Sequence, residues 1–145
     1  MPIFAQAAAS AAGNGFDMKR IILIMSILSM FGLGSCAQDR AFESVSVTGF
    51  EAAVSDSTVV LVDVRTAAEH AQGFIPGTVA NIDVLGDDFA EKAAKLPSDK
   101  TIAIYCRSGN RSKTAARILV DKGYKVVELA SGFNGWVAAG KEVSR

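Results

Sequence analysis

The 145-residue chain is short of the residues on which several classes of protein depend. It has only two cysteines and one histidine, which are too few for a metal cluster, so we expect no metal site. Its 15 basic residues are balanced by 15 acidic ones. Because nucleic-acid-binding domains usually carry a basic excess, this balance argues against a nucleic-acid partner. The sequence also shows no internal repeat, no low-complexity segment and no nucleotide-binding motif.

The apolar run IILIMSILSMFGLG, residues 21–34, is too short to cross a bilayer comfortably. It follows Lys19 and Arg20 and ends in small residues, a pattern typical of a secretory signal peptide. The letters LGSC, residues 33–36, resemble the lipobox of bacterial lipoproteins. That resemblance implies cleavage before Cys36 and a lipid on its sulfur. An uncleaved membrane anchor at the N-terminus is the alternative interpretation.

These features divide the chain into four expected segments. Met18 begins an ordinary signal peptide, so residues 1–17 are interpreted as a non-native extension and residues 18–35 as the signal peptide. Residues 36–43 form the lipidated cysteine with a polar tether, and residues 44–143 form the folded domain. We therefore expect an exported protein of the bacterial envelope or periplasm, held to a membrane by its lipid.

The folded domain alternates strand and helix signals. Apolar and β-branched runs predict strands at residues 44–47, 58–64, 79–84, 101–106 and 125–129. Helix formers predict helices at 48–56, 87–96 and 112–122, a helical turn from residue 68, and a short closing helix within 131–140. This alternation predicts an α/β fold with a parallel central sheet of about five strands and helices on both faces. Ligands bind beyond the carboxyl ends of such strands, which is where Cys106 lies.

The segment CRSGNRS, residues 106–112, carries the candidate chemistry. Gly109 permits a positive φ, so consecutive backbone N–H groups can form an anion-binding cup at the start of the next helix. Arg107, Arg111 and Lys113 add positive charge. A thiol in such surroundings loses proton affinity and becomes a nucleophile, provided that solvent reaches it. The alternative is an inert cysteine that serves as a small core residue.

CRSGNRS also resembles the active-site loop of the rhodanese family of sulfurtransferases. LVDVR (61–65), AEHAQGFIPGTVANID (68–83) and GFNGW (132–136) resemble further family segments in the same order, so the likeness covers about residues 44–140. Two departures stand out, because Phe74 replaces a frequent histidine and Thr78 replaces the usual alanine. We expect Phe74 to change packing rather than chemistry.

The resemblance implies a single rhodanese-like domain that catalyses sulfur transfer without a cofactor. The Cys106 thiolate would attack the sulfane sulfur of a small anionic donor such as thiosulfate, release sulfite and carry a persulfide. A thiol, cyanide or a protein cysteine would then accept that sulfur. The implied substrate-binding residues are Arg107, Ser108, Gly109, Asn110, Arg111 and Ser112. Asp63 and Arg65 would brace the loop or each other, and His70 is expected on the surface.

Two other functions remain open at this level. The domain could be a persulfide carrier, or a thiol-redox or docking module that does not turn over. It could also be a cysteine-dependent phosphatase or an arsenate reductase of related fold. Cysteine phosphatases use Cys-x5-Arg, whereas Cys106 and Arg111 are spaced as Cys-x4-Arg. The shorter loop makes a smaller cup, which suits one sulfur atom better than a tetrahedral oxyanion.

Overall fold

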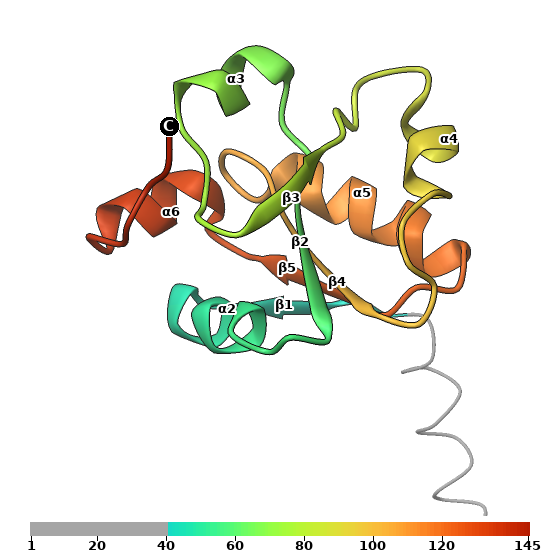
Figure 1. Cartoon of the computed structure of the whole chain (residues 1–145), viewed down its shortest axis with the longest axis horizontal. Helices are drawn as coiled ribbons and strands as arrows, with labels where there is room; N and C mark the ends of the chain where they lie inside the picture. Colours follow the sequence, from blue (N-terminus) through green and yellow to red (C-terminus); the bar gives the residue numbers. More distant parts are fainter. Residues whose placement is uncertain (1–40) are drawn as a thin grey trace, which may run out of the picture. The chain divides into compact units, whose positions relative to one another are not determined.

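The computed structural model describes residues 41–145, and the expected extension, signal peptide and lipidated Cys36 lie outside these residues. Strands and helices alternate along the described part of the chain (Figure 1). In order, the elements are β1 (Glu43–Val45), α2 (Val47–Val54), β2 (Val59–Asp63), α3 (Ala67–Gln72), β3 (Thr78–Asn81), α4 (Phe89–Ala93), β4 (Thr101–Tyr105), α5 (Asn110–Asp121), β5 (Val126–Leu129) and α6 (Gly132–Ala138).

The five strands form one parallel sheet in the order β1-β5-β4-β2-β3. This confirms the predicted α/β fold and its number of strands. β4 is central, and its residues Thr101 to Tyr105 pair in register with Val59 to Asp63 of β2. Since β2 and β4 end side by side, Asp63 and Cys106 are brought to the same carboxyl edge of the sheet. Figure 1 shows α3 and the loop before α5 at this edge.

The side chains of β4 alternate between two cores, as the pleat of a strand requires. Ile102, Ile104 and Cys106 belong to the core that α4 and α5 cover. Ala103 and Tyr105 belong to the opposite core, beneath α2 and α6. Helices therefore lie on both faces of the sheet, and Cys106 faces the α5 side.

The helix after the candidate loop begins at Asn110, two residues before the predicted start. Gly109 takes a left-handed conformation (φ 99°) and serves as the N-cap of α5. Ser112 therefore lies in the first turn of the helix, with its side chain buried. At the other end, Gly123 follows the C-cap with φ 94°, the left-handed conformation in which a glycine commonly ends a helix.

The prediction for α4 was too long at both ends. We expected residues 87–96, whereas the helix covers Phe89–Ala93. Asp88 occupies the N-cap without a side-chain capping bond, so Asp87 and Asp88 precede the helix. Phe89 and Ala93 are the residues of α4 that enter the core.

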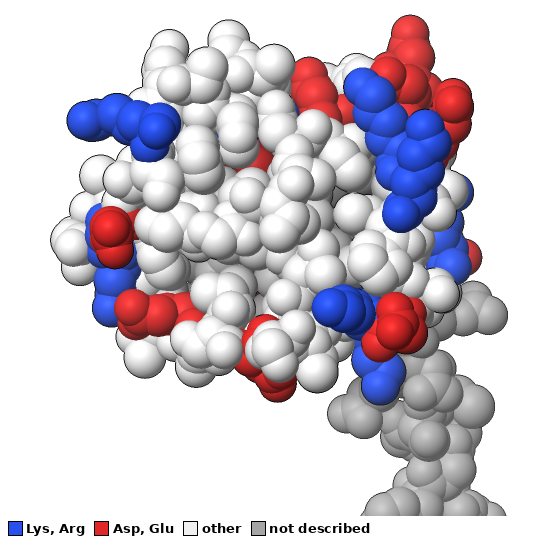
Figure 2. All heavy atoms as spheres, in the orientation of Figure 1, with Lys and Arg blue, Asp and Glu red and all other residues white. Residues whose placement is uncertain are grey.

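Within residues 41–145 no helix has the length and apolar character that crossing a membrane requires. Figure 2 shows acidic and basic side chains gathered at the margins of one face, often beside each other, around an uncharged centre. Among the described residues of this face, the charges form no continuous basic stripe that would bind a polyanion.

Candidate active site

Cys106 follows the last residue of β4 and lies under the loop that leads into α5. The backbone N–H of Gly109 donates a hydrogen bond to its sulfur, with 3.1 Å between nitrogen and Sγ. On the other side, Sγ lies 3.5 Å from the hydroxyl oxygen of Ser112. The left-handed conformation of Gly109 turns the backbone so that this N–H points inward.

Two opposing influences act on the ionisation of Cys106. Burial, the largest single influence, disfavours the charged thiolate. Hydrogen bonds from the Ser112 side chain and from the backbone N–H groups of Ser112, Gly109 and Ser108 favour it. Together these donors outweigh burial, so the pKa of the Cys106 thiol lies below its ordinary value. A lowered pKa is the property that a nucleophilic cysteine needs.

The loop is held from behind by the turn between β5 and α6. The N–H of Phe133 donates to the carbonyl of Cys106 at 2.7 Å, and the N–H of Asn134 donates to the carbonyl of Arg107 at 3.0 Å. Gly132 permits this approach, since a Cβ there would overlap the backbone of Arg107. A Cβ on Gly109 would likewise overlap the carbonyl oxygen of Ala130. The segment GFNGW is therefore part of the support of the loop.

The sequence analysis required that solvent reach the Cys106 sulfur, but the structure buries this residue. Cys106 has an exposed fraction of 0%. A cavity of about 290 Å³ opens at Arg107, the residue that follows Cys106. The cavity is lined by Arg65, Glu69, Gln72, Arg107, Phe133 and Asn134, and Cys106 is not among them. A donor in this cavity therefore meets the sulfur only after neighbouring side chains have moved.

Asp63 and Arg65 brace each other, one of the two roles expected of them. The Arg65 Nη2 lies 2.7 Å from Asp63 Oδ2, and Nε donates to both carboxylate oxygens at 3.0 and 3.1 Å. Arg65 is 3% exposed, and its guanidinium stacks over the ring of Phe133, 4.2 Å from the ring centre. It also lines the cavity, so it presents a fixed positive charge there.

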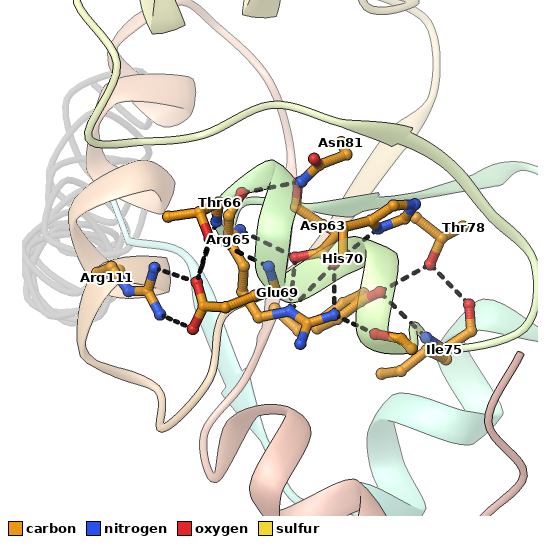
Figure 3. Close-up of polar contacts among 11 residues, drawn as sticks. Asp63, Arg65, Thr66, Glu69, His70, Ile75, Thr78, Asn81 and Arg111 are labelled. Carbon is orange, nitrogen blue, oxygen red and sulfur yellow. Dashed lines mark hydrogen bonds and ion pairs between the residues drawn. The ribbon is translucent and has the colours of Figure 1, made fainter. Parts of the chain in front are cut away.

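His70 was expected on the surface; its side chain is partly exposed, but it also has structural contacts that the sequence did not predict. Its Nδ1 lies 2.9 Å from Asp63 Oδ2, and its ring stacks on Phe74 with centroids 4.5 Å apart. Figure 3 shows His70 pointing towards Asp63 within a network of polar contacts. Phe74, the departure from the family pattern, thus packs against this histidine.

The two arginines of the loop have different surroundings. Arg107 is exposed and lines the cavity. Arg111 donates to both carboxylate oxygens of Glu69, at 2.9 and 2.8 Å (Figure 3). Its charge is therefore paired, as that of Arg65 is paired with Asp63. Of the two arginines that line the cavity, Arg65 and Arg107, only Arg107 is exposed.

The remaining loop residues fall into two groups. Ser108 and Asn110 have exposed side chains, whereas Ser112 is buried beside the sulfur. Lys113 contacts the carbonyl oxygen of Gly109 at 3.0 Å through its Nζ. It therefore steadies the turn that presents the Gly109 N–H to Cys106.

Two acidic residues of the site were missed by reasoning from the sequence. Glu69 pairs with Arg111, which lies 42 residues further along the chain, and no local pattern indicates that pairing. Glu128 is fully buried in β5 and hydrogen bonds to Ser112. Its position in the otherwise apolar strand VVEL was the signal that could have revealed it.

Comparison with known proteins agrees with the fold. Residues 46–139 match the rhodanese-like domain, so the chain belongs to the rhodanese-like family. A sulfurtransferase of Allochromatium vinosum is 40% identical over 83 residues, which cover 57% of this chain and 75% of that protein. The thiosulfate sulfurtransferase GlpE of Pseudoalteromonas translucida is 30% identical over 103 residues, covering 70% and 95% respectively.

A solved structure shares the architecture. The crystal structure of a rhodanese-related protein from Thermoplasma volcanium aligns with a TM-score of 0.64 and 27% identity. The alignment covers 71% of this chain and 98% of that one. The described domain is therefore a single rhodanese-like domain whose relatives include sulfurtransferases.

Proposed function

We propose that this protein is a sulfurtransferase in which Cys106 carries sulfane sulfur as a persulfide. The observation that carries the proposal is the contact between the Gly109 N–H and the Cys106 sulfur at the start of α5. A donor set of backbone N–H groups that lowers the pKa of a thiol is what a nucleophilic cysteine requires. The sulfurtransferase relatives support the same reaction class.

The reaction that we propose takes place in two steps. The Cys106 thiolate attacks the outer sulfur of thiosulfate, a new sulfur–sulfur bond forms, and the bond to the sulfonate sulfur breaks. Its electron pair leaves with sulfite, and the negative charge remains on the persulfide. An acceptor such as cyanide or a thiolate then attacks the outer sulfur, and the Cys106 thiolate is restored. No proton is needed by the leaving sulfite, in keeping with a loop that contains no acid or histidine.

The cavity suits a small anion. Its volume of about 290 Å³ lies at the lower end of ligand sites. Arg65 and Arg107 bring positive charge to its wall, and a guanidinium pairs well with sulfonate-like oxygens. In this proposal Arg107 attracts the anionic donor. Arg65 is a positive charge held in place by Asp63, and Arg111 is paired with Glu69.

Access to the sulfur has to be created during the reaction. Because Cys106 has no exposed surface, a side chain of the cavity wall must move before the donor makes contact. Arg107 is the candidate, since it is exposed and its backbone is held independently by Asn134. The expected consequence is that small donors react much faster than bulky ones.

The burial of Cys106 also favours a second candidate function, a persulfide carrier that turns over slowly. A phosphatase or arsenate reductase is less well supported. Such enzymes need an arginine that cradles the oxyanion, whereas Arg111 donates both of its bonds to Glu69.

Steady-state kinetics test the proposed function. With thiosulfate and cyanide as substrates, the wild type should give parallel double-reciprocal lines, the signature of a two-step covalent mechanism. Cys106→Ser should show no transfer while keeping its thermal unfolding midpoint. Labelling of Cys106 without turnover would indicate the carrier, and turnover by Cys106→Ser would contradict the nucleophile.

The cellular location is a separate proposal that rests on the sequence of residues 18–36. We propose that the precursor is exported and anchored in the bacterial envelope by a lipid on Cys36. Mass spectrometry of the protein from membranes should find the lipid on an N-terminal Cys36. A mature N-terminus upstream of residue 36, or no lipid on this cysteine, would contradict the proposal.

A further inference from the structure

Glu128 is an acidic residue in the interior of the sheet. It is 0% exposed and pairs in register with Ile104 of β4, two residues before Cys106. Its carboxylate accepts hydrogen bonds from Ser112 Oγ at 2.7 Å and from the hydroxyl of Ser44, and it lies 3.1 Å from Lys113 Nζ. A buried carboxylate is costly unless it is well partnered, so its position beside the active-site helix calls for an explanation.

The contacts form a continuous polar chain that ends at the sulfur. It runs from Lys113 to Glu128, from Glu128 to Ser112, and from Ser112 to Cys106. A serine hydroxyl has one hydrogen to donate. Three acceptors compete for this hydrogen, namely Glu128 Oε2 at 2.7 Å, the carbonyl of Gly109 at 3.1 Å and Cys106 Sγ at 3.5 Å.

The competition has a different outcome for the two forms of Cys106. When the sulfur carries its proton, S–H can donate to Ser112 Oγ while the serine donates to Glu128. When the sulfur is a thiolate, it accepts from the Gly109 N–H, and it gains a further donor when the serine hydrogen turns from Glu128 towards Sγ. Glu128 then keeps Ser44 and Lys113 as partners.

We propose that Glu128 is a positioning residue for Cys106, which acts through Ser112 by competing for the serine hydrogen and so opposes loss of the thiol proton. This inference rests on the proposed function in giving Cys106 a chemical role, and it concerns a residue that never touches the substrate. The backbone N–H groups around Sγ favour the thiolate form of Cys106, and Glu128 opposes this effect.

Opposing the ionisation of Cys106 in this way has a chemical use. The nucleophilicity of a thiolate falls as its pKa falls, and an attacking thiol works best when its pKa is near the ambient pH. A sulfur that is stabilised too strongly by the cup would ionise readily but attack poorly. In this proposal the Glu128 carboxylate lets the thiol ionise while the thiolate stays a good nucleophile.

The other charges near the sulfur must be included in this balance. The positive side chains come from the loop and α5. The paired Asp63 and Arg65 come from the end of β2 and the segment after it, and Glu128 comes from β5. The positive groups are Arg107, Arg111 and Lys113. Arg111 is paired with Glu69, and Lys113 is paired with Glu128. Removing the Glu128 charge therefore also leaves the charge of Lys113 without its partner.

The change Glu128→Gln consequently has one expected sign. It removes a negative charge, it leaves Lys113 unpaired, and it allows Ser112 to donate to the sulfur, and each of these effects favours the thiolate. We expect the midpoint of Cys106 ionisation to fall by about one pH unit, the size of a typical shift caused by a nearby charge. Ser112→Ala, which removes a donor to the thiolate, should move the midpoint upwards.

The experiment follows the rate of Cys106 alkylation against pH in the full chain, with the Cys106 peptide quantified by mass spectrometry so that Cys36 does not interfere. Besides the wild type, it uses Glu128→Gln, Ser112→Ala and the double variant. If Glu128 acts through Ser112 as well as through its charge, the shift caused by Glu128→Gln should be smaller in the Ser112→Ala background. Glu91→Gln on the exposed side of α4 is the matched control, with no expected shift.

An unchanged midpoint in Glu128→Gln, or an equal shift with and without Ser112, would overturn the proposal. Should Glu128→Gln fail to fold, Lys113→Met is the second variant to measure. It should keep the fold, because the Lys113 side chain is partly exposed. It should raise the midpoint, and no rise would overturn the proposal. Alkylation needs neither sulfur donor nor acceptor, so this result stands apart from success or failure of the proposed sulfur transfer.

Discussion

Arg111 of α5 and Glu69 of α3 are joined by two parallel hydrogen bonds of 2.9 and 2.8 Å. The same carboxylate accepts from the N–H and the hydroxyl of Thr66, which closes the capping box of α3. One acidic side chain therefore ties the start of α3 to the start of α5. Glu69 itself lines the cavity, so the pair with Arg111 holds that part of the wall in place.

The Glu69–Arg111 pair should make stability depend on pH in the acid range. The bonds from Arg111, followed by those from Thr66, lower the pKa of Glu69 from 4.5 to about 2, despite partial burial. A lowered carboxyl pKa stabilises the fold fully above 4.5, and this contribution is lost as the pH falls from 4.5 towards 2. We expect Glu69→Gln to reduce the free energy of unfolding by about 1–2 kcal/mol at pH 7.

Denaturant unfolding at several pH values measures this effect. The difference between the wild type and Glu69→Gln should shrink as the pH falls and vanish near pH 2, the folded-state pKa of Glu69. Asp88→Asn, in the exposed pair with Lys92, is the control and should change stability little. A Glu69→Gln difference that stays constant with pH would show that the ion pair is not its cause.

Gly109→Ala should damage both the loop and the reactivity of Cys106. Gly109 has φ 99°, and a Cβ there would overlap the carbonyl oxygen of Ala130. The strain should cost roughly 1–3 kcal/mol, and displacement of the N–H should raise the pKa of Cys106. Gly77→Ala is a matched control, because Gly77 also has a positive φ (89°) but open space around it. If both variants lose the same stability and Cys106 alkylation is unaffected, the close approach to Ala130 is unimportant.

Arg107→Ala should weaken an anionic donor selectively. Arg107 is exposed at the cavity, so its removal takes away positive charge without opening the core. We expect the KM for thiosulfate to rise about tenfold, equivalent to about 1.4 kcal/mol, while a neutral organic trisulfide is affected far less. Arg117→Ala, an exposed cation further along α5, is the control. An equal loss for both donors would show that Arg107 supports the loop rather than the charge of the donor.

The order of strands and helices could be predicted because the signals are local. The β-branched run before Asp63 and the apolar run before Cys106 both predict buried strands, and parallel pairing then brings their ends together. The start of α5 could not be predicted as well. The Gly109 N-cap uses a backbone conformation rather than a side-chain cap, so no serine, threonine or aspartate marks it.

The charged partners of the site could not be predicted, because they join residues that are distant in sequence. Glu69 and Arg111 are 42 residues apart, and Glu128 meets Ser112 only because β5 lies next to β4 in the sheet. His70 was misjudged for a different reason, because Asp63 lies only seven residues before it but on another element, the end of β2. The support of the loop likewise depends on the turn at Gly132, which no local pattern connects to the loop.

The most direct measurement is the mass of the peptide that contains Cys106 after the protein has been treated with thiosulfate under non-reducing conditions. The central claim predicts a gain of one sulfur atom on Cys106, which disappears when cyanide is added and thiocyanate is released. Cys106→Ser should show no such gain at residue 106. A wild-type Cys106 that stays unmodified under thiosulfate, or a stable adduct that cyanide does not remove, would contradict the account.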